Sequence, residues 1–274
     1  MEIVPMPELP EVETVKRGLE IAIQGKKLVN VQTRRLDLRK PIPQDLNERL
    51  KGLRATELSR RGKYLLINWE GKETLIIHLG MSGRAVIGAG NPNPAKHDHV
   101  IFNFEDGVSV TYTDPRRFGL IILGDHEALE SMGPEPLADD FTGEILKGRL
   151  KNRKNPIKQA LLDQENVAGV GNIYACEALF RAEISPLRPA NSLALKEANL
   201  LVAAIKAVLF EAIKKGGSSL KDHVRPDGEI GLFQHNFKVY DKEGESCPGC
   251  DCEDKVKRIV QGGRATFYCA KRQK

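Results

Sequence analysis

The sequence predicts an α+β multidomain fold, in which a β-rich N-terminal half is followed by a helical C-terminal half that ends in short strands. The chain has 274 residues, more than one domain of ~100 to 200 residues usually holds. Short apolar runs separated by turn residues fill positions 27–123, and helical periodicity dominates positions 145–215. Four of the five cysteines lie between positions 247 and 269, which marks this region as a candidate metal-binding hairpin.

The first expected element is a helix that begins just after Pro7. Apolar residues recur there at spacings of three and four, as one face of an amphipathic helix requires: Leu9, Val12, Val15, Leu19 and Ile23. Pro10 and the acidic residues around it lie where a first helical turn favours proline and negative charge.

An antiparallel sheet, as a sandwich or a barrel, is expected next. Runs rich in Val, Ile, Leu and Tyr predict strands over residues 28–36, 63–69, 74–80, 99–104, 108–113 and 119–123. Helices are predicted over residues 145–150, 157–164, 173–184 and 193–215, and strands around 256–260 and 265–269. The expected domains are an N-terminal β domain over 7–130, a linker over 131–146, a helical domain over 147–233 and a hairpin over 234–274.

Composition excludes several classes of protein. Hydrophobic residues make up 41% of the chain and charged residues 29%, as in globular rather than disordered or fibrous proteins. The longest apolar stretch, residues 200–213, is interrupted by Lys206 and Glu211 and is shorter than the ~20 residues that span a bilayer. With no secretory signal among the first residues, we expect a cytoplasmic protein, in which clustered cysteines more often bind metal than form disulfides.

Basic residues gather in two places in the C-terminal half. The net charge is only +5, but residues 149–158 contain five basic residues and no acid, and residues 254–274 are also strongly basic. Such patches suit binding of a phosphate backbone. A solvated helix face followed by a basic tail explains the same charges equally well.

The clustered cysteines predict a zinc site. Thiolates on a tight turn that face another thiolate across a hairpin supply the tetrahedral ligand set of structural zinc: Cys247, Cys250, Cys252 and Cys269. A usual zinc ribbon ends in a second CxxC pair, whereas here Arg272 stands at the expected last cysteine. Either Cys250 and Cys252 both bind, or three thiolates bind weakly, or the hairpin folds without metal.

Eight blocks, in order from Met6 to the C-terminus, resemble the formamidopyrimidine-DNA glycosylase family of bacterial DNA-repair enzymes. They are MPELPEVETVKRGL at 6–19, RRGKYLL at 60–66, HLGMSG at 78–83, DPRRFG at 114–119, GPEPL at 133–137, AGVGNIYACEALF at 168–180, GGSSLKD at 216–222 and GGRATFYC at 262–269. The resemblance implies an N-terminal β-sandwich flanked by helices, a helix-two-turns-helix in the helical domain, and a zinc-finger-like β-hairpin.

The resemblance also implies a bifunctional glycosylase and AP lyase that excises 8-oxoguanine and formamidopyrimidines from duplex DNA. Its nucleophile would be the backbone nitrogen of Pro7, with Glu8 as acid, Glu11 as a positioning group and Lys63 near a phosphate. An α-amine titrates at ~7.7 to 8.0, well below a lysine, so that an unprotonated fraction exists near neutral pH. A secondary amine that attacks C1′ gives a charged iminium, which is an electron sink.

Further residues are implied to hold the DNA while the damaged base lies outside the stack. Met81 and Phe118 would fill the vacated space and Arg116 would bind the unpaired cytosine. Backbone contacts would come from His78, Lys158, Asn172 and Arg264. The segment from GGSSLKD to about Phe233 would cover the flipped base. The implied partner is damaged double-stranded DNA, bound by a monomer at the bacterial nucleoid.

The start of the chain departs from the family pattern. Five residues, MEIVP, precede Met6, and a proline acylated by Met6 has no nucleophilic amine. We expect that translation starts at Met6, which is then removed. If the extension is retained, the alternative is a lesion-binding protein without catalysis, and a second alternative is an endonuclease VIII-type enzyme that acts on oxidised pyrimidines.

Overall fold

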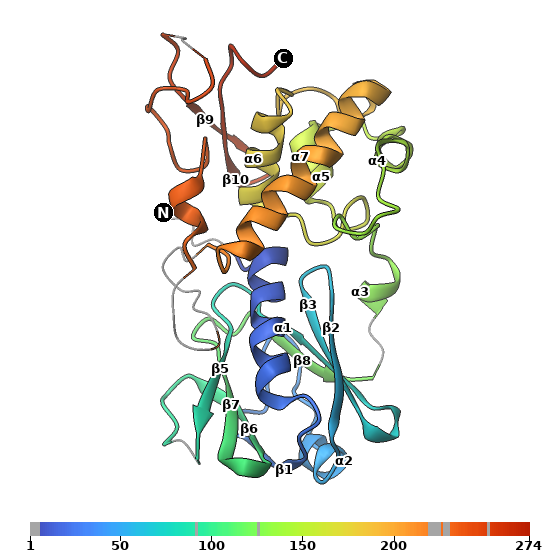
Figure 1. Ribbon diagram of the computed structural model, residues 1–274, viewed down its shortest axis with the longest axis vertical. Coiled ribbons are helices and arrows are strands. Elements are labelled where there is room, and N and C mark those ends of the chain that lie inside the picture. Colours follow the sequence, from blue (N-terminus) through green and yellow to red (C-terminus); the bar gives the residue numbers. More distant parts are fainter. Residues whose placement is uncertain (1–5, 91–92, 125–126, 219–225, 227–230, 251–252) are drawn as a thin grey trace. The chain divides into compact units, whose positions relative to one another are not determined.

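The computed structural model describes residues 6–90, 93–124, 127–218, 226, 231–250 and 253–274 (Figure 1). They form two compact units. Unit 1 holds the described residues of Met1–Leu129 and of Lys215–Leu232, and unit 2 holds those of Glu130–Lys214 and Phe233–Lys274. None of the helices in this part of the chain has the length and apolar character needed to cross a bilayer.

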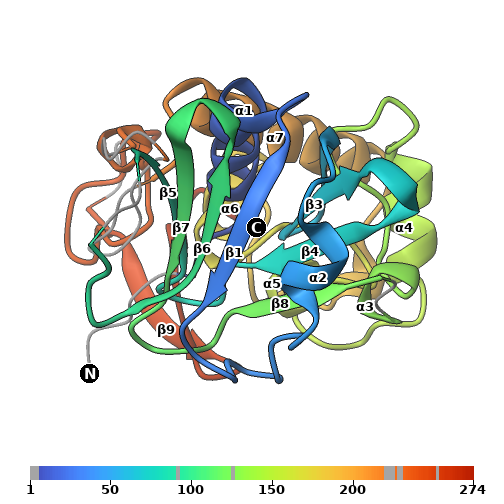
Figure 2. The ribbon, with the colours of Figure 1, turned by 90° about the horizontal axis from the view of Figure 1, so that it is seen from below.

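Within its described residues, unit 1 contains two four-stranded antiparallel sheets (Figure 2). One has the order β1 (Leu28–Thr33), β6 (Asp98–Phe104), β7 (Val108–Thr113) and β5 (Arg84–Ala89). The other has the order β2 (Ala55–Arg61), β3 (Tyr64–Trp69), β4 (Thr74–His78) and β8 (Leu120–Leu123). Side chains of both sheets join one buried apolar cluster, among them Phe102, Val110, Leu65 and Ile77, which confirms the predicted β-sandwich.

Helix α1 (Leu9–Ile23) packs against strands of both sheets, β2, β3 and β5. Its buried face contains the five apolar residues whose spacing predicted it. A capping box between Glu8 and Glu11 begins the helix, and Pro10 lies in its first turn. Short helical turns complete unit 1: α2 (Leu46–Leu50), η1 (Glu70–Lys72) and η2 (Glu105–Gly107).

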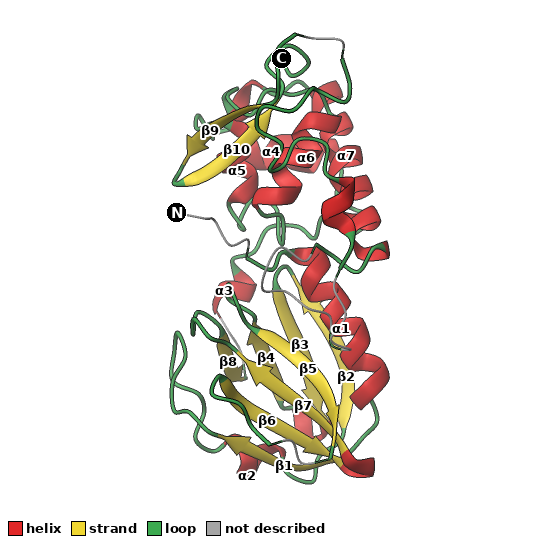
Figure 3. Cartoon of the chain, turned by 90° about the vertical axis from the view of Figure 1, so that its left-hand side faces the viewer, coloured by secondary structure: helices red, strands yellow, loops and turns green. Residues whose placement is uncertain are grey.

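Unit 2 is built around helix α7 (Leu195–Lys214), which packs against α4 (Gly143–Leu150) and α6 (Asn172–Arg181). Helix α6 also contacts α5 (Ile157–Leu162) and strand β10 (Arg264–Tyr268). Strand β9 (Lys257–Gln261) pairs with β10 in an antiparallel hairpin (Figure 3). Short turns lie between these elements: η3 (Ala190–Ser192) and η4 (Phe233–Asn236). The turn α3 (Glu127–Glu130) precedes them and crosses the boundary in the sequence between the two units.

The segment after α7 returns to unit 1. The backbone nitrogen of Ser218 donates to the Glu11 carboxylate in α1, and Ser218 forms an isolated β-bridge with Leu232. The described residues of Lys215–Leu232 accordingly belong to unit 1, although they follow α7 of unit 2 in the sequence. The finer division expected from the sequence, with boundaries at 130, 146 and 233, stays a prediction.

Candidate functional site

Pro7 and Glu8 lie directly before the first turn of α1. Pro7 is buried, and the Glu8 and Glu11 side chains are each 2% exposed. The backbone nitrogen of Glu8 donates to Oε2 of Glu11 at 2.9 Å. A helix N-terminus presents unpaired N–H groups and partial positive charge, which stabilise carboxylates placed there. The start of α1 thus holds two buried acids beside Pro7, whose role as nucleophile, implied by the resemblance, stays a prediction.

The second carboxylate oxygen of Glu11 holds the segment after α7. Oε1 accepts from the backbone nitrogen of Ser218 at 2.8 Å and from its hydroxyl at 3.0 Å. Gly217 has φ +79°, and a Cβ there would lie 3.0 Å from the same oxygen. The first residues of the GGSSLKD block are therefore fixed against α1, while Ser219–Asp222 lie outside the described residues.

Lys63 lies in the tight turn between β2 and β3, after Gly62, and is 5% exposed. This turn is attached to α1 because Arg60 bonds both the Gly62 carbonyl (2.9 Å) and the Glu13 carboxylate (3.1 Å). Burial raises the pKa of Glu13, but Arg17, Lys16 and Arg60 together outweigh burial and lower it. The hairpin that carries Lys63 is thus joined to the helix that follows Pro7.

The three predicted space-filling residues lie on two neighbouring loops of unit 1. Met81 is half-buried in the turn between β4 and β5, and Arg116 and Phe118 are exposed on the loop between β7 and β8. The Arg116 guanidinium lies 5.2 Å from the centre of the Phe118 ring, and Phe118 is 46% exposed. We call residues 79–83 and 114–119 the wedge loops. Exposed apolar side chains beside a cation suit insertion between bases.

His78 is buried at the end of β4 and supports the first wedge loop. Its Nδ1 accepts from the backbone nitrogen of Gly80 at 3.0 Å, and its ring packs 4.7 Å from that of Tyr64. The side chain is only 8% exposed. In this structure His78 organises the turn, and its direct contact with DNA stays a prediction.

Two of the three predicted DNA contacts of unit 2, Lys158 and Asn172, meet at one backbone carbonyl. Lys158 Nζ and Asn172 Nδ2 each donate to the Ala265 oxygen at 3.0 Å, and Lys158 also donates to the Thr266 hydroxyl. Lys158 is fully buried, whereas Arg264 is exposed where β10 begins. Lys158 and Asn172 therefore fix the strand that presents Arg264, and their own contacts with phosphate stay predictions.

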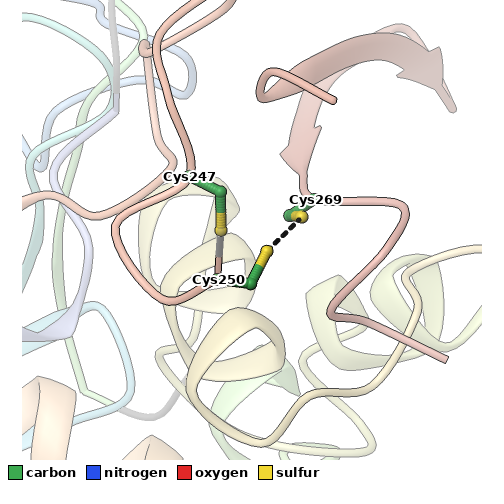
Figure 4. Close-up of side chains that lie close together, drawn as sticks. All are labelled: Cys247, Cys250 and Cys269. Carbon is green, nitrogen blue, oxygen red and sulfur yellow. Dashed lines mark hydrogen bonds between the residues drawn. The ribbon is translucent and has the colours of Figure 1, made fainter. Parts of the chain in front are cut away.

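Three of the predicted zinc ligands gather in unit 2 (Figure 4). The sulfurs of Cys247, Cys250 and Cys269 all lie within 4.8 Å of one another, and Cys250 Sγ is 3.6 Å from Cys269 Sγ. Burial raises the pKa of the Cys247 thiol, the Gly249 backbone lowers it, and the two neighbouring thiols raise it. Three converging thiols fit a thiophilic ion such as zinc. Cys252 lies outside the described residues.

Arg272 attaches the cysteine turn to the rest of unit 2. Its guanidinium donates to the Gly249 carbonyl, forms an ion pair with Glu183 at 2.7 Å and lies 5.3 Å from the Phe180 ring. Its backbone nitrogen donates to the Cys269 sulfur. A permanently charged guanidinium cannot ligate a metal cation. Arg272 therefore contributes hydrogen bonds where the expected fourth thiolate would contribute a metal bond.

Sequence reasoning missed two groups of positioning residues. Asp114 and Ser82 join the wedge loops, as described below. Glu177 on α6 is fully buried, and its carboxylate accepts the backbone N–H groups of Lys238, Val239 and Tyr240 at 2.9 to 3.0 Å. The available signal was a lone acid inside the apolar run IYACEALF, where a buried carboxylate requires several donors.

Comparison with known proteins gives matches over nearly the whole chain. A family model described as the formamidopyrimidine-DNA glycosylase N-terminal domain matches residues 6–121, and one described as the formamidopyrimidine-DNA glycosylase H2TH domain matches residues 132–224. Formamidopyrimidine-DNA glycosylase of Rhodospirillum rubrum is 54% identical over 281 residues, with 98% of this chain and 100% of the relative covered. The Ruegeria pomeroyi protein of the same name is 50% identical, with the same coverage.

The solved structures to which this chain is similar are also formamidopyrimidine-DNA glycosylases (Fpg). The MutM (Fpg) protein of Thermus thermophilus has a TM-score of 0.87 and 41% identity, with 97% of this chain and 98% of that chain covered. Lactococcus lactis Fpg in complex with DNA containing an abasic site has a TM-score of 0.87 and 34% identity. A mutant of that protein in complex with Fapy-dG-containing DNA has a TM-score of 0.88 and 35% identity. In both cases 97% of this chain and 99% of the other are covered.

Proposed function

The chain belongs to the formamidopyrimidine-DNA glycosylase family, and from that premise we propose that it excises oxidised purines from duplex DNA through a Schiff base on Pro7. It is a DNA glycosylase of base excision repair, with the AP lyase activity typical of the family. The proposed substrates are 8-oxoguanine and formamidopyrimidines. The observation that carries the assignment is the position of Pro7 and Glu8 at the start of α1, inside the matched region.

The chemistry begins once Met6 is removed and the Pro7 nitrogen is a free secondary amine. Its lone pair attacks C1′, and the base leaves with the electrons of the C1′–base bond and takes up a proton from water. The Pro7 nitrogen gives up its own proton to water and so regains the lone pair that opens the ring. Glu8 donates a proton to the sugar-ring oxygen, so that the ring opens to an iminium. A base then removes a proton from C2′, the C–H electrons pass into the iminium, and the 3′ phosphate leaves with the electrons of the C3′–O bond (β-elimination). Removal of a proton from C4′ lets the 5′ phosphate leave in the same way with the electrons of the C5′–O bond (δ-elimination).

The remaining site residues are proposed to hold the DNA. Lys63 contacts phosphate near the damaged nucleotide, Met81 and Phe118 fill the space left by the extruded base, and Arg116 binds the unpaired cytosine. Phosphate contacts come from His78, Lys158, Asn172 and Arg264. Support comes from the exposure of Arg116, Phe118 and Arg264 and from the contacts that orient their loops.

We further propose one zinc ion on Cys247, Cys250 and Cys269, with Cys252 as the fourth thiolate. The three converging sulfurs support this assignment. The ion would cross-link the cysteine turn to the end of β10, and so hold the hairpin that presents Arg264. The protein is proposed to act as a monomer on chromosomal DNA in the cytoplasm, at the nucleoid.

Borohydride trapping tests the mechanism. A chain that begins at Pro7 should become covalently attached to a duplex with 8-oxoguanine opposite cytosine, because borohydride reduces the iminium to a stable amine. A matched chain that begins at Met1 and retains all six residues before Pro7 should bind this duplex and give no adduct. Absence of an adduct with the Pro7 chain would contradict the mechanism. Faster adduct formation with thymine glycol would contradict the substrate class and favour an endonuclease VIII-type enzyme.

A further inference from the structure

The loop between β7 and β8 is organised by the carboxylate of Asp114, which is fully buried. Its Oδ1 accepts from the Ser82 hydroxyl at 2.6 Å, and its Oδ2 accepts from the Gly119 backbone nitrogen at 2.8 Å and from the Tyr112 hydroxyl at 3.4 Å. Burial and then the Asp114 charge raise the pKa of Tyr112 well above its usual value, so the phenol keeps the proton that it donates. One carboxylate thus binds three donors from three segments.

Ser82 connects the two wedge loops through a single hydroxyl. Its Oγ donates to Asp114 and accepts from the backbone nitrogen of Arg116 at 3.0 Å. Ser82 directly follows Met81, and Arg116 is itself one of the proposed DNA contacts. The turn that carries Met81 and the loop that carries Arg116 and Phe118 are therefore joined by one side chain.

The same loops also touch through their backbones. Gly80 has φ +64°, and a Cβ at this position would lie 2.4 Å from the carbonyl carbon of Phe118 and 2.6 Å from its oxygen. A Cβ on Gly119 would lie 1.7 Å from the Tyr112 hydroxyl oxygen. Only glycine fits either position. The two loops thus meet at Gly80 and at Ser82, on both sides of Met81.

We propose that the Ser82–Asp114 pair makes Met81, Arg116 and Phe118 act as one preformed unit when the damaged base leaves the stack. Ser82 and Asp114 are positioning residues for this step, and the inference rests on the proposed role of the wedge loops. Preformation matters because loops that are ordered before binding lose less conformational entropy on binding. It therefore raises affinity for DNA from which a base has left, and leaves affinity for intact duplex unchanged.

The first test replaces Ser82 by alanine in the chain that begins at Pro7. Affinity is measured for a duplex with a tetrahydrofuran abasic analogue opposite cytosine and for the same duplex without it. Ser82→Ala should weaken binding to the abasic duplex about tenfold, the effect of losing one charge-assisted hydrogen bond, with no change for intact duplex. Ser109→Ala is the matched control: Ser109 is fully buried on β7, and its hydroxyl has no partner among the described residues.

The second test measures coupling between the loops. Each single variant, Met81→Ala and Phe118→Ala, weakens abasic binding by some factor. If Met81 and Phe118 act as one unit, the factor for the double variant should be smaller than the product of the two single factors, by about threefold or more. In the Ser82→Ala background the two effects should multiply. If Ser82 only supported the fold, Ser82→Ala would lower the stability of the protein but would leave the coupling between Met81 and Phe118 unchanged.

The outcomes separate this inference from the proposed function. If neither Met81→Ala nor Phe118→Ala alone weakens abasic binding, the proposed role of the wedge loops is wrong. If both weaken it independently, and Ser82→Ala behaves like Ser109→Ala, the wedge loops act on DNA but the coupling through Ser82 and Asp114 is wrong.

Discussion

The wedge loops of unit 1 and the cysteine turn of unit 2 are both held by one charged side chain, but of opposite sign. Asp114 accepts hydrogen bonds from three donors and is fully buried. Arg272 donates to Gly249 and Glu183, and its side chain is 26% exposed while that of Glu183 is 57% exposed. Exposed ion pairs contribute little to stability, whereas buried charged hydrogen bonds contribute more. The wedge loops can therefore depend on one carboxylate, whereas the cysteine turn needs a second cross-link, which the zinc ion proposed on its thiols would supply.

The largest expected effect is that of Asp114→Asn. An amide offers one acceptor oxygen where the carboxylate offers two, so Ser82 and Gly119 cannot both keep an acceptor. We expect the free energy of unfolding to fall by about 3 kcal/mol, measured by urea denaturation. The control Asp106→Asn, at an exposed turn position with φ 66° that asparagine tolerates, should change it by less than about 0.5 kcal/mol. If both variants lost the same free energy of unfolding, the claim that a buried charged side chain stabilises its loop more than an exposed one would be wrong.

Arg272→Ala should lower the free energy of unfolding by less than Asp114→Asn does. Its effect on DNA binding should become visible when a chelator removes metal. Loss of the Gly249 and Glu183 contacts and of the Phe180 stacking should cost about 1.5 kcal/mol. A chelator should then weaken binding to intact and damaged duplex alike, and more strongly in Arg272→Ala than in the parent, because the proposed zinc ion and the guanidinium would hold the same turn. Fluorescence anisotropy with and without chelator measures this difference. Lys271→Ala, at the exposed neighbouring position, is the control. An equal response to chelator in all three proteins would show that the two cross-links are independent.

Arg264→Ala tests whether the hairpin of unit 2 affects DNA binding differently from the wedge loops of unit 1. An exposed arginine that contacts phosphate contributes to binding of any sequence. The slope of log affinity against log salt should fall by about 1, with the ratio of damaged to intact affinity unchanged. A salt titration on both duplexes checks this. A change in the ratio would place Arg264 with the wedge loops as a determinant of lesion recognition.

The smallest effect is expected at Glu13, which attaches the Lys63 hairpin to α1. Its pKa is lowered in the folded state, so its contribution is present above the unfolded value near 4.5 and is lost as pH falls through the lower folded value. The group is partly solvated, so Glu13→Gln should cost about 0.5 kcal/mol at neutral pH and nothing in acid. Urea titrations at pH 7 and below pH 4 test the sign. A difference that grows in acid would contradict it.

Strands that carry an apolar run were predictable from the sequence, including the edge strands β1 and β8, whereas the edge strands β2 and β5 were not. The interior strands β3, β4, β6 and β7 coincide with predicted apolar runs. The two missed strands, β2 and β5, lie at sheet edges, where each pairs with one neighbour. In β2 only Ala55 and Leu58 are buried, so its sequence, ATELSRR, has no apolar run. Pairing with β3 rather than side-chain burial makes this segment a strand.

In the candidate site, too, some residues were predictable from the sequence and others were not. The resemblance named the residues proposed to touch DNA, but not the residues that orient them. The Ser82–Asp114 bond joins positions 32 residues apart through two side chains, and no local spacing or periodicity encodes such a bond. Lys158 illustrates the reverse case, because it stands in a basic segment that reads as a surface patch and yet is fully buried against β10.

The hydrogen bonds between Glu11 and Ser218 have a consequence for synthesis of the chain on the ribosome. Their partners are 207 residues apart, and Lys215–Leu232 belongs to unit 1 although all of unit 2 up to Lys214 is made first. Domains generally fold as units while the chain emerges. The first unit cannot complete the acid pair beside Pro7 until most of the second has left the ribosome. Nascent chains that stop before Ser218 would carry Pro7, the proposed nucleophile, beside a Glu11 carboxylate that lacks its two Ser218 donors.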